Sequence, residues 1–441
     1  MTNIQFRLEQ YMQTWEDAER FSGTVLVAQG DHILLEKGYG YGNHEYAMPN
    51  TPSTIYNIGS ITKLFTAAAV MQLYDRQKLR LNEPMETYFP GYRHGDRITI
   101  HHLLSSTSGI PDYTELSQYS PRDRLSAESI REWLNHELLQ GEPGQQAQKS
   151  NSNFVFLARI VEIVSGMEIG AYYEKFLFAP LGLKHTGISC NEEILTNKAY
   201  GYSCSGEGVV CAEYYDMSGA FGSGFLYSTA ADLFTWIQAL GSGTVISKEA
   251  YDRMLTPYGY LWYLEASAGY GCCVKGEPVE EMFMDGNIYG YTCTLQRYIS
   301  GDFTVIVLSN NDASPVARLV KGLRSILYTG ATSIIVKPEL ADTADYEQYR
   351  HFAGVYCFPP MGWHFTIHYE ESLLYVDRLF NQEFKKKKFQ LKLVADTAEA
   401  VVLACVVCES TFTFHKATEV KSQQVTYSFD TLNLPYERSG G

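Results

Sequence analysis

One apolar stretch organises the hydrophobic pattern of the chain. It runs Leu64-Phe-Thr-Ala-Ala-Ala-Val-Met-Gln-Leu73, and Ser60 and Lys63 stand directly before it. The stretch is apolar on nearly every face, which is typical of a helix buried in a core. Residues three apart are neighbours on a helix, so both polar side chains lie on one face of its first turn. We therefore predict a buried helix that carries a serine and a lysine at its N-terminal end.

Strand-like runs occur near both ends of the first 330 or so residues. After an amphipathic segment over residues 4–20, runs at 23–28 and 32–37 flank Gln29-Gly30-Asp31, a pattern typical of a hairpin. A third strand-like segment covers residues 39–45. Further runs at 259–264, 291–298 and 303–308 precede a helix from Ser314-Pro315 to Tyr328. We predict one sheet built from both ends of this region, layered against helices in an α/β arrangement.

The pattern between about residues 82 and 225 is helical and rich in loops. It predicts a short helix over 98–104 and longer ones over 127–137 and 150–164, the last ending at Gly166. Thr229-Ala-Ala-Asp232 matches a capping box that opens another helix. We interpret residues 82–225 as a helical insertion, with a site in the cleft where it meets the sheet.

The C-terminal part of the chain has a different pattern. Short alternating runs follow one another about every ten residues from 354 to 429, which predicts a small antiparallel barrel or sandwich. We therefore expect a catalytic domain over 1–335, a polar linker over 336–345 and a β-barrel domain over 346–441. Two roles of the barrel stay open, a lid and a dimer contact. A dimer contact would make the protein a homodimer.

Composition narrows the range of partners. Lysine and arginine number 35 against 50 aspartate and glutamate, a formal net charge of -15 at pH 7. Nucleic acids and anionic membranes are bound by basic patches, so neither is an expected partner. No apolar run reaches the roughly 20 residues of a membrane span, and the N-terminal segment lacks the apolar centre of a signal peptide, so we expect a cytoplasmic protein.

The nine cysteines are scattered, which fits reduced thiols in a cytosolic protein. Cys405 and Cys408 have a C-x-x-C spacing, but they lie in a strand-like run without a second Cys or His pair. A structural role is therefore favoured over a metal site, and we expect no metal.

The pair Ser60 and Lys63 carries the candidate chemistry. Serine becomes a nucleophile when a base takes its proton, and a lysine is such a base when burial or nearby positive charge lowers its pKa. Taken alone, the S-x-x-K spacing is better explained by a core helix that carries an incidental serine and lysine.

Several further motifs resemble the serine β-lactamase-related family, which includes class C β-lactamases, D-stereospecific peptidases, esterases and peptide cyclases similar to penicillin-binding proteins. They cover about residues 20–330 in the family's order, and the tail resembles the lipocalin-like domain of some members. The motifs are Gly23-Thr-Val-Leu-Val, Tyr39-Gly40, the Ser60 to Lys63 tetrad, Leu79 to Pro84, His102 to Tyr113, Pro143-Gly144, Ser150-Asn151 and Gly222 to Leu233.

The resemblance implies roles for individual residues. Ser60 would be the acylated nucleophile and Lys63 its base. The backbone amides of Ser60 and Asn287 would form the oxyanion hole, and Asn151 would bind the substrate amide. Two motifs depart from the family, which normally has Tyr-x-Asn where this chain has Lys149-Ser150-Asn151, and His or Lys two residues before a glycine where it has Met284-Asp285-Gly286.

These departures change the expected chemistry. Two ammonium groups close together disfavour being charged at once, so Lys63 or Lys149 should lose its proton easily and serve as a base. Met284 supplies no cation and Asp285 adds a negative charge, so substrates with a carboxylate beside the scissile bond, such as penicillins, should be poor.

We therefore predict a serine hydrolase or acyltransferase that acts on an ester, amide or thioester of a small molecule or peptide, without a metal or organic cofactor. The alternative is a protein of the same fold that binds its ligand in the cleft without turnover.

Overall fold

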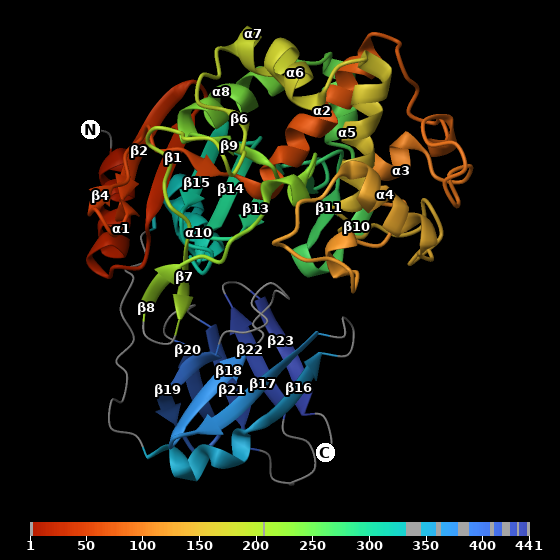
Figure 1. The fold of residues 1–441 in the computed structure, drawn as a ribbon. Helices are drawn as coiled ribbons and strands as arrows, with labels where there is room; N and C mark the ends of the chain where they lie inside the picture. Colours follow the sequence, from red (N-terminus) through yellow and green to blue (C-terminus); the bar gives the residue numbers. More distant parts are fainter. Residues whose placement is uncertain are drawn as a thin grey trace. The chain divides into compact units, whose positions relative to one another are not determined.

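The computed structural model describes residues 3–205, 208–331, 345–358, 363–377, 388–405, 410–416, 424–429 and 432–438. The chain forms two compact units (Figure 1). The first comprises Met1–Glu9, Ser22–Gly201 and Ala212–Asp312, and the second Gln10–Phe21, Tyr202–Cys211 and Ala313–Gly441. Apart from Asp345, the predicted linker over 336–345 lies outside the described residues.

An antiparallel sheet of eight strands forms the centre of the first unit. Strand β1 pairs with β15 from Gly23↔Ser309 to Gln29↔Phe303, so the beginning and the end of this region share one sheet, as predicted. Every residue of β15 is buried, in keeping with a strand covered on both faces. The strands, in spatial order, are β10 (Gly259–Leu261), β11 (Ala266–Ala268), β12 (Cys273–Lys275), β13 (Glu281–Ile288), β14 (Tyr291–Tyr298), β15 (Phe303–Ser309), β1 (Gly23–Gln29) and β2 (His32–Tyr39).

Helix α2 (Thr62–Asp75) is the predicted buried helix. It is buried at every position from Thr62 to Leu73 and lies beside α5 (Ser152–Ser165) (Figure 1). The ring of Phe65 stacks on that of Trp236 from α8, with 4.0 Å between ring centroids. The other helices of this unit are α3 (Ile100–Leu104), α4 (Ala127–His136), α6 (Ile169–Tyr173), α7 (Ala179–Leu181), α8 (Ala230–Gly241) and α9 (Lys248–Met254).

Two small sheets accompany the large one. Strand β9 (Leu226–Ser228) pairs with both β5 (Tyr56–Asn57) and β6 (Gly187–Ile188), and β3 (Tyr41–Asn43) pairs with β4 (Met48–Pro49). The backbone amide of Ile58 donates to the carbonyl of Leu226 over 3.0 Å. The chain immediately before Ser60 is therefore anchored to β9, which directly follows the predicted insertion.

The second unit contains a closed eight-stranded antiparallel barrel, which confirms the barrel alternative. It closes where β16 pairs with β23, at Tyr356↔Arg438. The hairpin of β7 (Tyr202–Ser205) and β8 (Gly208–Cys211) also belongs to this unit, and Cys204 joins the barrel core. The barrel strands are β16 (Gly354–Phe358), β17 (Trp363–Glu370), β18 (Leu373–Asp377), β19 (Lys388–Asp396), β20 (Ala400–Cys405), β21 (Ser410–His415), β22 (Gln424–Phe429) and β23 (Leu432–Arg438).

Two helices that precede the barrel in the sequence belong wholly or in part to the second unit. Helix α1 (Asn3–Asp17) begins in the first unit and continues in the second, and α10 (Val316–Thr329) lies wholly in the second. The hydroxyl of Tyr11 donates to the carbonyl of Leu319 over 3.2 Å and so ties α1 to α10. Among the described residues, no helix has both the length and the apolar character that crossing a bilayer requires.

Some local predictions were wrong. The strand predicted over 259–264 ends at Leu261. A 3-10 turn, Trp262–Leu264, follows, and Glu265 ends this turn in a left-handed backbone conformation with φ of 48°. At α8 the Thr229 side chain accepts from the amide of Asp232, but the carboxylate of Asp232 instead accepts from the amide of His185 and the hydroxyl of Thr186. The capping box is therefore only half formed.

Candidate active site

Ser60 and Lys63 lie where a 3-10 turn runs into the central helix. The turn spans Gly59–Ile61, and α2 begins at Thr62. The Nζ of Lys63 donates a hydrogen bond to the Oγ of Ser60 over 2.6 Å. The predicted neighbourhood of the two side chains is therefore confirmed, although the serine stands in the turn rather than in the α-helix itself.

Lys63 is buried among acceptors. Its side chain is 5% exposed, and its Nζ also donates to the Oδ1 of Asn151 over 2.8 Å and to the carbonyl of Ser223 over 3.2 Å. Burial foremost, and then the positive charge of Lys149, lowers the pKa of Lys63 to about 7, while Asp112 acts in the opposite direction. A large share of Lys63 is thus neutral near pH 7 and able to accept a proton.

The triplet that contains Lys149 and Asn151 precedes α5. Asn151 occupies the N-cap position of that helix without capping it, since its Nδ2 donates to the Oδ2 of Asp112 over 3.0 Å. Lys149 is exposed, and its charge affects the pKa values of both Lys63 and Glu115. The triplet therefore places one amide and one cation around the Ser60–Lys63 pair.

Strand β13, which the sequence pattern did not predict, carries the remaining candidate residues. Its pairing with β12 ends at Cys273↔Phe283, so beyond Phe283 this edge of β13 has no paired strand. The segment before Ser60 occupies the free edge. A Cβ placed on Gly286 would lie 2.0 Å from the carbonyl oxygen of Ile58, so only glycine allows this approach.

Gly59, the residue before Ser60, lies against the backbone of Asn287 at this edge. Gly59, with φ of 49°, lies so close to β13 that an added Cβ would be 2.9 Å from the nitrogen of Asn287. Ile288 and Tyr291 are paired and flank a two-residue turn. Backbone amides along a hairpin strand point alternately towards and away from the partner strand, so the amide of Asn287, one residue before Ile288, points away from β14. The amide of Ser60, second in its 3-10 turn, has no acceptor within that turn.

Met284 and Asp285 point to opposite faces of β13 because side chains alternate along a strand. Met284 is half-buried against the core that contains α2. The carboxylate of Asp285 accepts from the Oγ1 of Thr294 over 2.6 Å. Although Asp285 keeps an exposed surface, dense packing around its carboxyl raises its pKa, while Thr294 and Lys275 act against that rise. Neither residue supplies a cation.

Sequence reasoning missed three residues that surround Lys63. They are Asp112, Ser223 and Phe154, whose ring centroid lies 5.5 Å from the Lys63 Nζ. Asp112 and Ser223 lie in motifs that carried the family resemblance, but nothing in their local sequence assigns them to this lysine. Phe154 lies on the apolar stripe of α5, where it is indistinguishable from any core residue.

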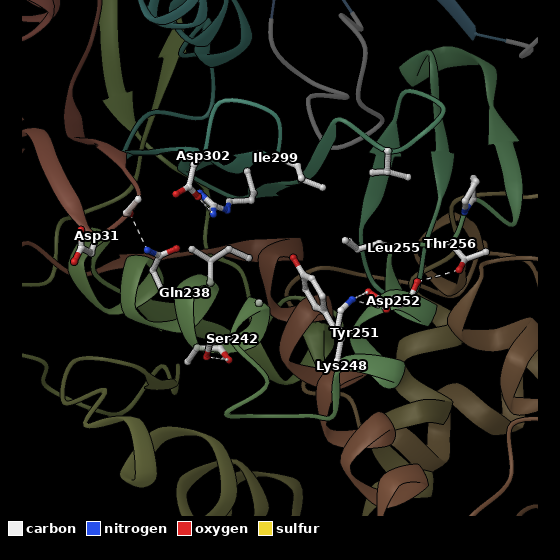
Figure 2. A pocket seen from close by; sticks show the side chains of 17 residues that line it. Asp31, Gln238, Ser242, Lys248, Tyr251, Asp252, Leu255, Thr256, Ile299 and Asp302 are labelled. Atoms are coloured by element: carbon white, nitrogen blue, oxygen red, sulfur yellow. Dashed lines mark hydrogen bonds and ion pairs between the residues drawn. The ribbon is translucent and has the colours of Figure 1, made fainter.

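A pocket of about 1100 Å³ lies elsewhere in the first unit. Figure 2 shows Gln238, Tyr251 and Asp302 around it. Its wall includes Ile299 and Asp302, in the turn between β14 and β15, whereas Asn287 pairs with Thr292 at the other end of β14. The pocket therefore lies at the opposite end of the sheet from Ser60 and is not the candidate site.

Among the residues that the structure describes, no group of three or more His, Cys, Asp or Glu side chains is placed to hold a metal ion. Cys405 is buried in the barrel core, and Cys408 of the C-x-x-C spacing lies outside the described residues. The cysteines within the described ranges are all free thiols.

An antiparallel sheet flanked by helices, with a serine and a buried lysine at the head of the central helix, defines a serine hydrolase fold. The chain belongs to the beta-lactamase family, whose model matches residues 7–327. The family resemblance seen in the sequence is thereby confirmed.

Curated relatives are named as penicillin-binding proteins and as a teichoic acid D-alanine hydrolase. The chain is 31% identical over 249 residues to PbpX of Bacillus subtilis (strain 168), covering 55% of this chain and 62% of that protein. It is 28% identical over 380 residues to penicillin-binding protein 4* of the same strain, covering 79% and 82%. It is 24% identical over 304 residues to the teichoic acid D-alanine hydrolase of Staphylococcus aureus (strain MRSA252), covering 69% and 73%.

Solved structures share the fold. The octameric penicillin-binding protein homologue from Pyrococcus abyssi superposes with a TM-score of 0.66 at 22% identity, covering 98% of this chain and 99% of that one. The D-amino acid amidase from Ochrobactrum anthropi SV3, in complex with D-phenylalanine, gives a TM-score of 0.61 at 22% identity and covers 69% and 92%. At these identities the likeness concerns the fold alone.

Proposed function

We propose that this protein is a serine hydrolase or acyltransferase that forms an acyl-enzyme on Ser60, with Lys63 as the base. One observation carries the proposal: the Nζ of Lys63 lies 2.6 Å from the Oγ of Ser60, on a buried side chain whose pKa is lowered to about 7. A neutral amine at hydrogen-bond distance from a hydroxyl is the arrangement that general-base activation of a serine needs.

The reaction proceeds in two halves. Ser60 Oγ attacks the carbonyl carbon of an ester, amide or thioester, and its proton passes to the Nζ of Lys63. The tetrahedral intermediate then expels the leaving group, which takes up a proton, and an ester of Ser60 remains. Water or an amine then attacks this acyl-enzyme and gives its proton to Lys149, which is neutral after protonating the leaving group. Lys63 returns its proton to the Oγ of Ser60, and the new product leaves. Hydrolysis and acyl transfer differ only in which nucleophile arrives.

Three other groups support these steps. The amides of Ser60 and Asn287 bind the oxyanion, and each preorganised donor of this kind contributes about 3 to 4 kcal/mol to transition-state stabilisation. Asn151 retains one Nδ2 hydrogen for the substrate amide, since the other is donated to Asp112. Lys149 stands where related motifs have tyrosine, and its ammonium delivers the proton to the leaving group.

The substrate class follows from charge. Met284 and Asp285 offer a carboxylate no cationic partner, so acyl donors without a carboxylate beside the scissile bond are preferred. The names of a D-alanine hydrolase and a D-amino acid amidase among the similar proteins support D-aminoacyl esters and amides as the first candidates.

A second candidate is ligand binding without turnover. It is favoured by the simultaneous replacement of the tyrosine and of the cation that family members normally carry, by Lys149 and Met284. The hydrogen bond between Lys63 and Ser60 argues against it, because a site that only binds has no need of an activated serine.

Intact-mass spectrometry distinguishes the two candidates. The protein, Ser60→Ala and Lys149→Tyr are exposed to a fluorophosphonate probe and to p-nitrophenyl esters. An adduct that forms on the parent protein and is absent from Ser60→Ala supports catalysis. No adduct on the parent, but one on Lys149→Tyr, means that position 149 silences the serine and that binding is the function.

A further inference from the structure

Asp112 is a buried carboxylate whose hydrogen-bonding capacity is full. Its side chain is 5% exposed and stands just before the 3-10 turn Tyr113–Glu115. Its Oδ2 accepts from the amide N and from the Nδ2 of Asn151, both over 3.0 Å. Its Oδ1 accepts from the amide of Thr114 over 3.1 Å and from the Thr114 hydroxyl over 3.0 Å. Four donors therefore fix this carboxylate in one position.

This arrangement determines which way the amide of Asn151 faces. A carboxylate only accepts, so the amide must turn its Nδ2 towards Asp112, and its Oδ1 then faces the Nζ of Lys63 at 2.8 Å. A flipped amide would set its carbonyl oxygen against the carboxylate and its NH₂ against the lysine, losing both bonds. The orientation of Asn151 is thus imposed from Asp112.

We propose that Asp112 is the positioning residue of the Ser60–Lys63 pair: through Asn151 it holds the Nζ of Lys63 against the Oγ of Ser60. The inference rests on the proposed function and deepens it, since it assigns a role to a residue that touches neither the serine nor the acyl group. Without its hydrogen bond to the Oδ1 of Asn151, Lys63 would keep only Ser60 and the carbonyl of Ser223 as acceptors among the described residues. Its ammonium could then rotate away from the serine.

The charge of Asp112 also balances that of Lys149. The groups that face Lys63 are the cation of Lys149, the carboxylate of Asp112 and the thiol of Cys273, besides its uncharged hydrogen-bond partners and the ring of Phe154. Burial and Lys149 favour the neutral amine, whereas Asp112 favours the ammonium. Asp112 therefore affects both the position and the proton of the base.

A purely structural role makes a different prediction. Asp112 also caps a 3-10 turn, and Asp216 caps the turn Met217–Ala220 in the same way, accepting from the amide of Ser218 over 3.1 Å and from its hydroxyl over 2.7 Å. No hydrogen bond of Asp216 leads to Lys63. Asp216→Asn is therefore a matched control for the loss of a capping carboxylate.

The test compares the parent, Asp112→Asn and Asp216→Asn in two measurements. The first is the rate of fluorophosphonate adduct formation from pH 5 to 10. The second is the titration of Lys63 by NMR with ¹³Cε-labelled lysine, assigned with Lys63→Met. For Asp112→Asn we expect the rate on the alkaline plateau to fall by about 100-fold. We also expect the rising part of the pH–rate profile, called the limb, and the titration of Lys63 both to move to lower pH. Asp216→Asn should resemble the parent in both.

The two proposals fail in different ways. If the parent forms no adduct that depends on Ser60, the proposed function is wrong, and the NMR titration still decides the role of Asp112. Two outcomes overturn the inference. In the first, Lys63 titrates in Asp112→Asn as it does in the parent. In the second, both variants lose the same factor in the rate of adduct formation and the pH–rate profile does not shift, so that Asp112 only caps its 3-10 turn.

Discussion

Gly59 and Asn287 are in backbone contact: a Cβ on Gly59 would lie 2.9 Å from the nitrogen of Asn287. The contact joins the turn that carries Ser60 to the edge of β13 at Asn287, whose amide is proposed to bind the oxyanion. Gly59 also has a φ of 49°, a conformation that side chains rarely adopt. Both the turn and its close approach to Asn287 therefore depend on a glycine at this position, and so does the proposed oxyanion hole.

Gly59→Ala should weaken acylation severely. The added methyl must push the turn away from β13, so at least one oxyanion donor is lost, and the adduct rate should fall by about 100-fold or more. The measurement is the second-order rate with the fluorophosphonate probe. Gly91→Ala is the control, because Gly91 has a φ of 76° but no atom within 4 Å of an added Cβ. Equal effects in the two variants would contradict a specific role for the contact.

The acylation rate should rise with pH through about 7. The active form of Lys63 is the neutral amine, which is depleted at pH values below its pKa of about 7. Lys149→Gln removes a positive charge that favours this neutral form, so the limb should move to higher pH. A pH–rate profile measures both positions. Lys248→Gln, which removes an exposed lysine paired with Asp252, should leave the limb unchanged.

Lys63 should also make stability depend on pH. Its pKa is about 7 in the folded protein and near 10.5 when unfolded, so the unfolded chain binds more protons between these values. Stability should therefore rise from pH 7 to 10.5, by an amount on the order of 5 kcal/mol. Thermal unfolding of the parent and of Lys63→Met at pH 6.5 and 9 tests this. The stability of the parent should increase relative to that of Lys63→Met as pH rises. Equal changes in the stability of the two proteins would count against a buried, neutral Lys63.

Met284→Lys should alter substrate preference. A lysine at this half-buried position restores a cation, so acylation by benzylpenicillin should increase relative to a p-nitrophenyl ester without a carboxylate. The expected change in the ratio is about ten- to a hundredfold, the equivalent of one hydrogen bond to a charged group. The two acylation rates are measured on parent and variant. Efficient turnover of benzylpenicillin by the parent would already refute the charge argument.

Local patterns were enough for much of the fold. The N-terminal hairpin, the buried helix after Ser60, the helix of residues 152–165 and most barrel strands follow from hydrophobic period and turn residues, which act over a few neighbours. Strand β13 escaped prediction because Met284-Asp285-Gly286-Asn287 does not alternate between apolar and polar residues. Strand β23 escaped because Pro435 lies within it, and proline is atypical of strand interiors.

The sequence by itself determined that Ser60 and Lys63 are neighbours, because three residues along a helical turn suffice to bring them together. Only the tertiary structure decided what that pair can do. The lowered pKa of Lys63 requires burial by segments distant in the chain, and its position requires Asn151 and Asp112, which lie 88 and 49 residues away and 39 from each other. Gly59, next to Ser60, approaches Asn287 along the edge of β13 beyond its pairing with β12. Contacts of this range leave no periodic trace in a sequence, since they depend on how whole elements pack.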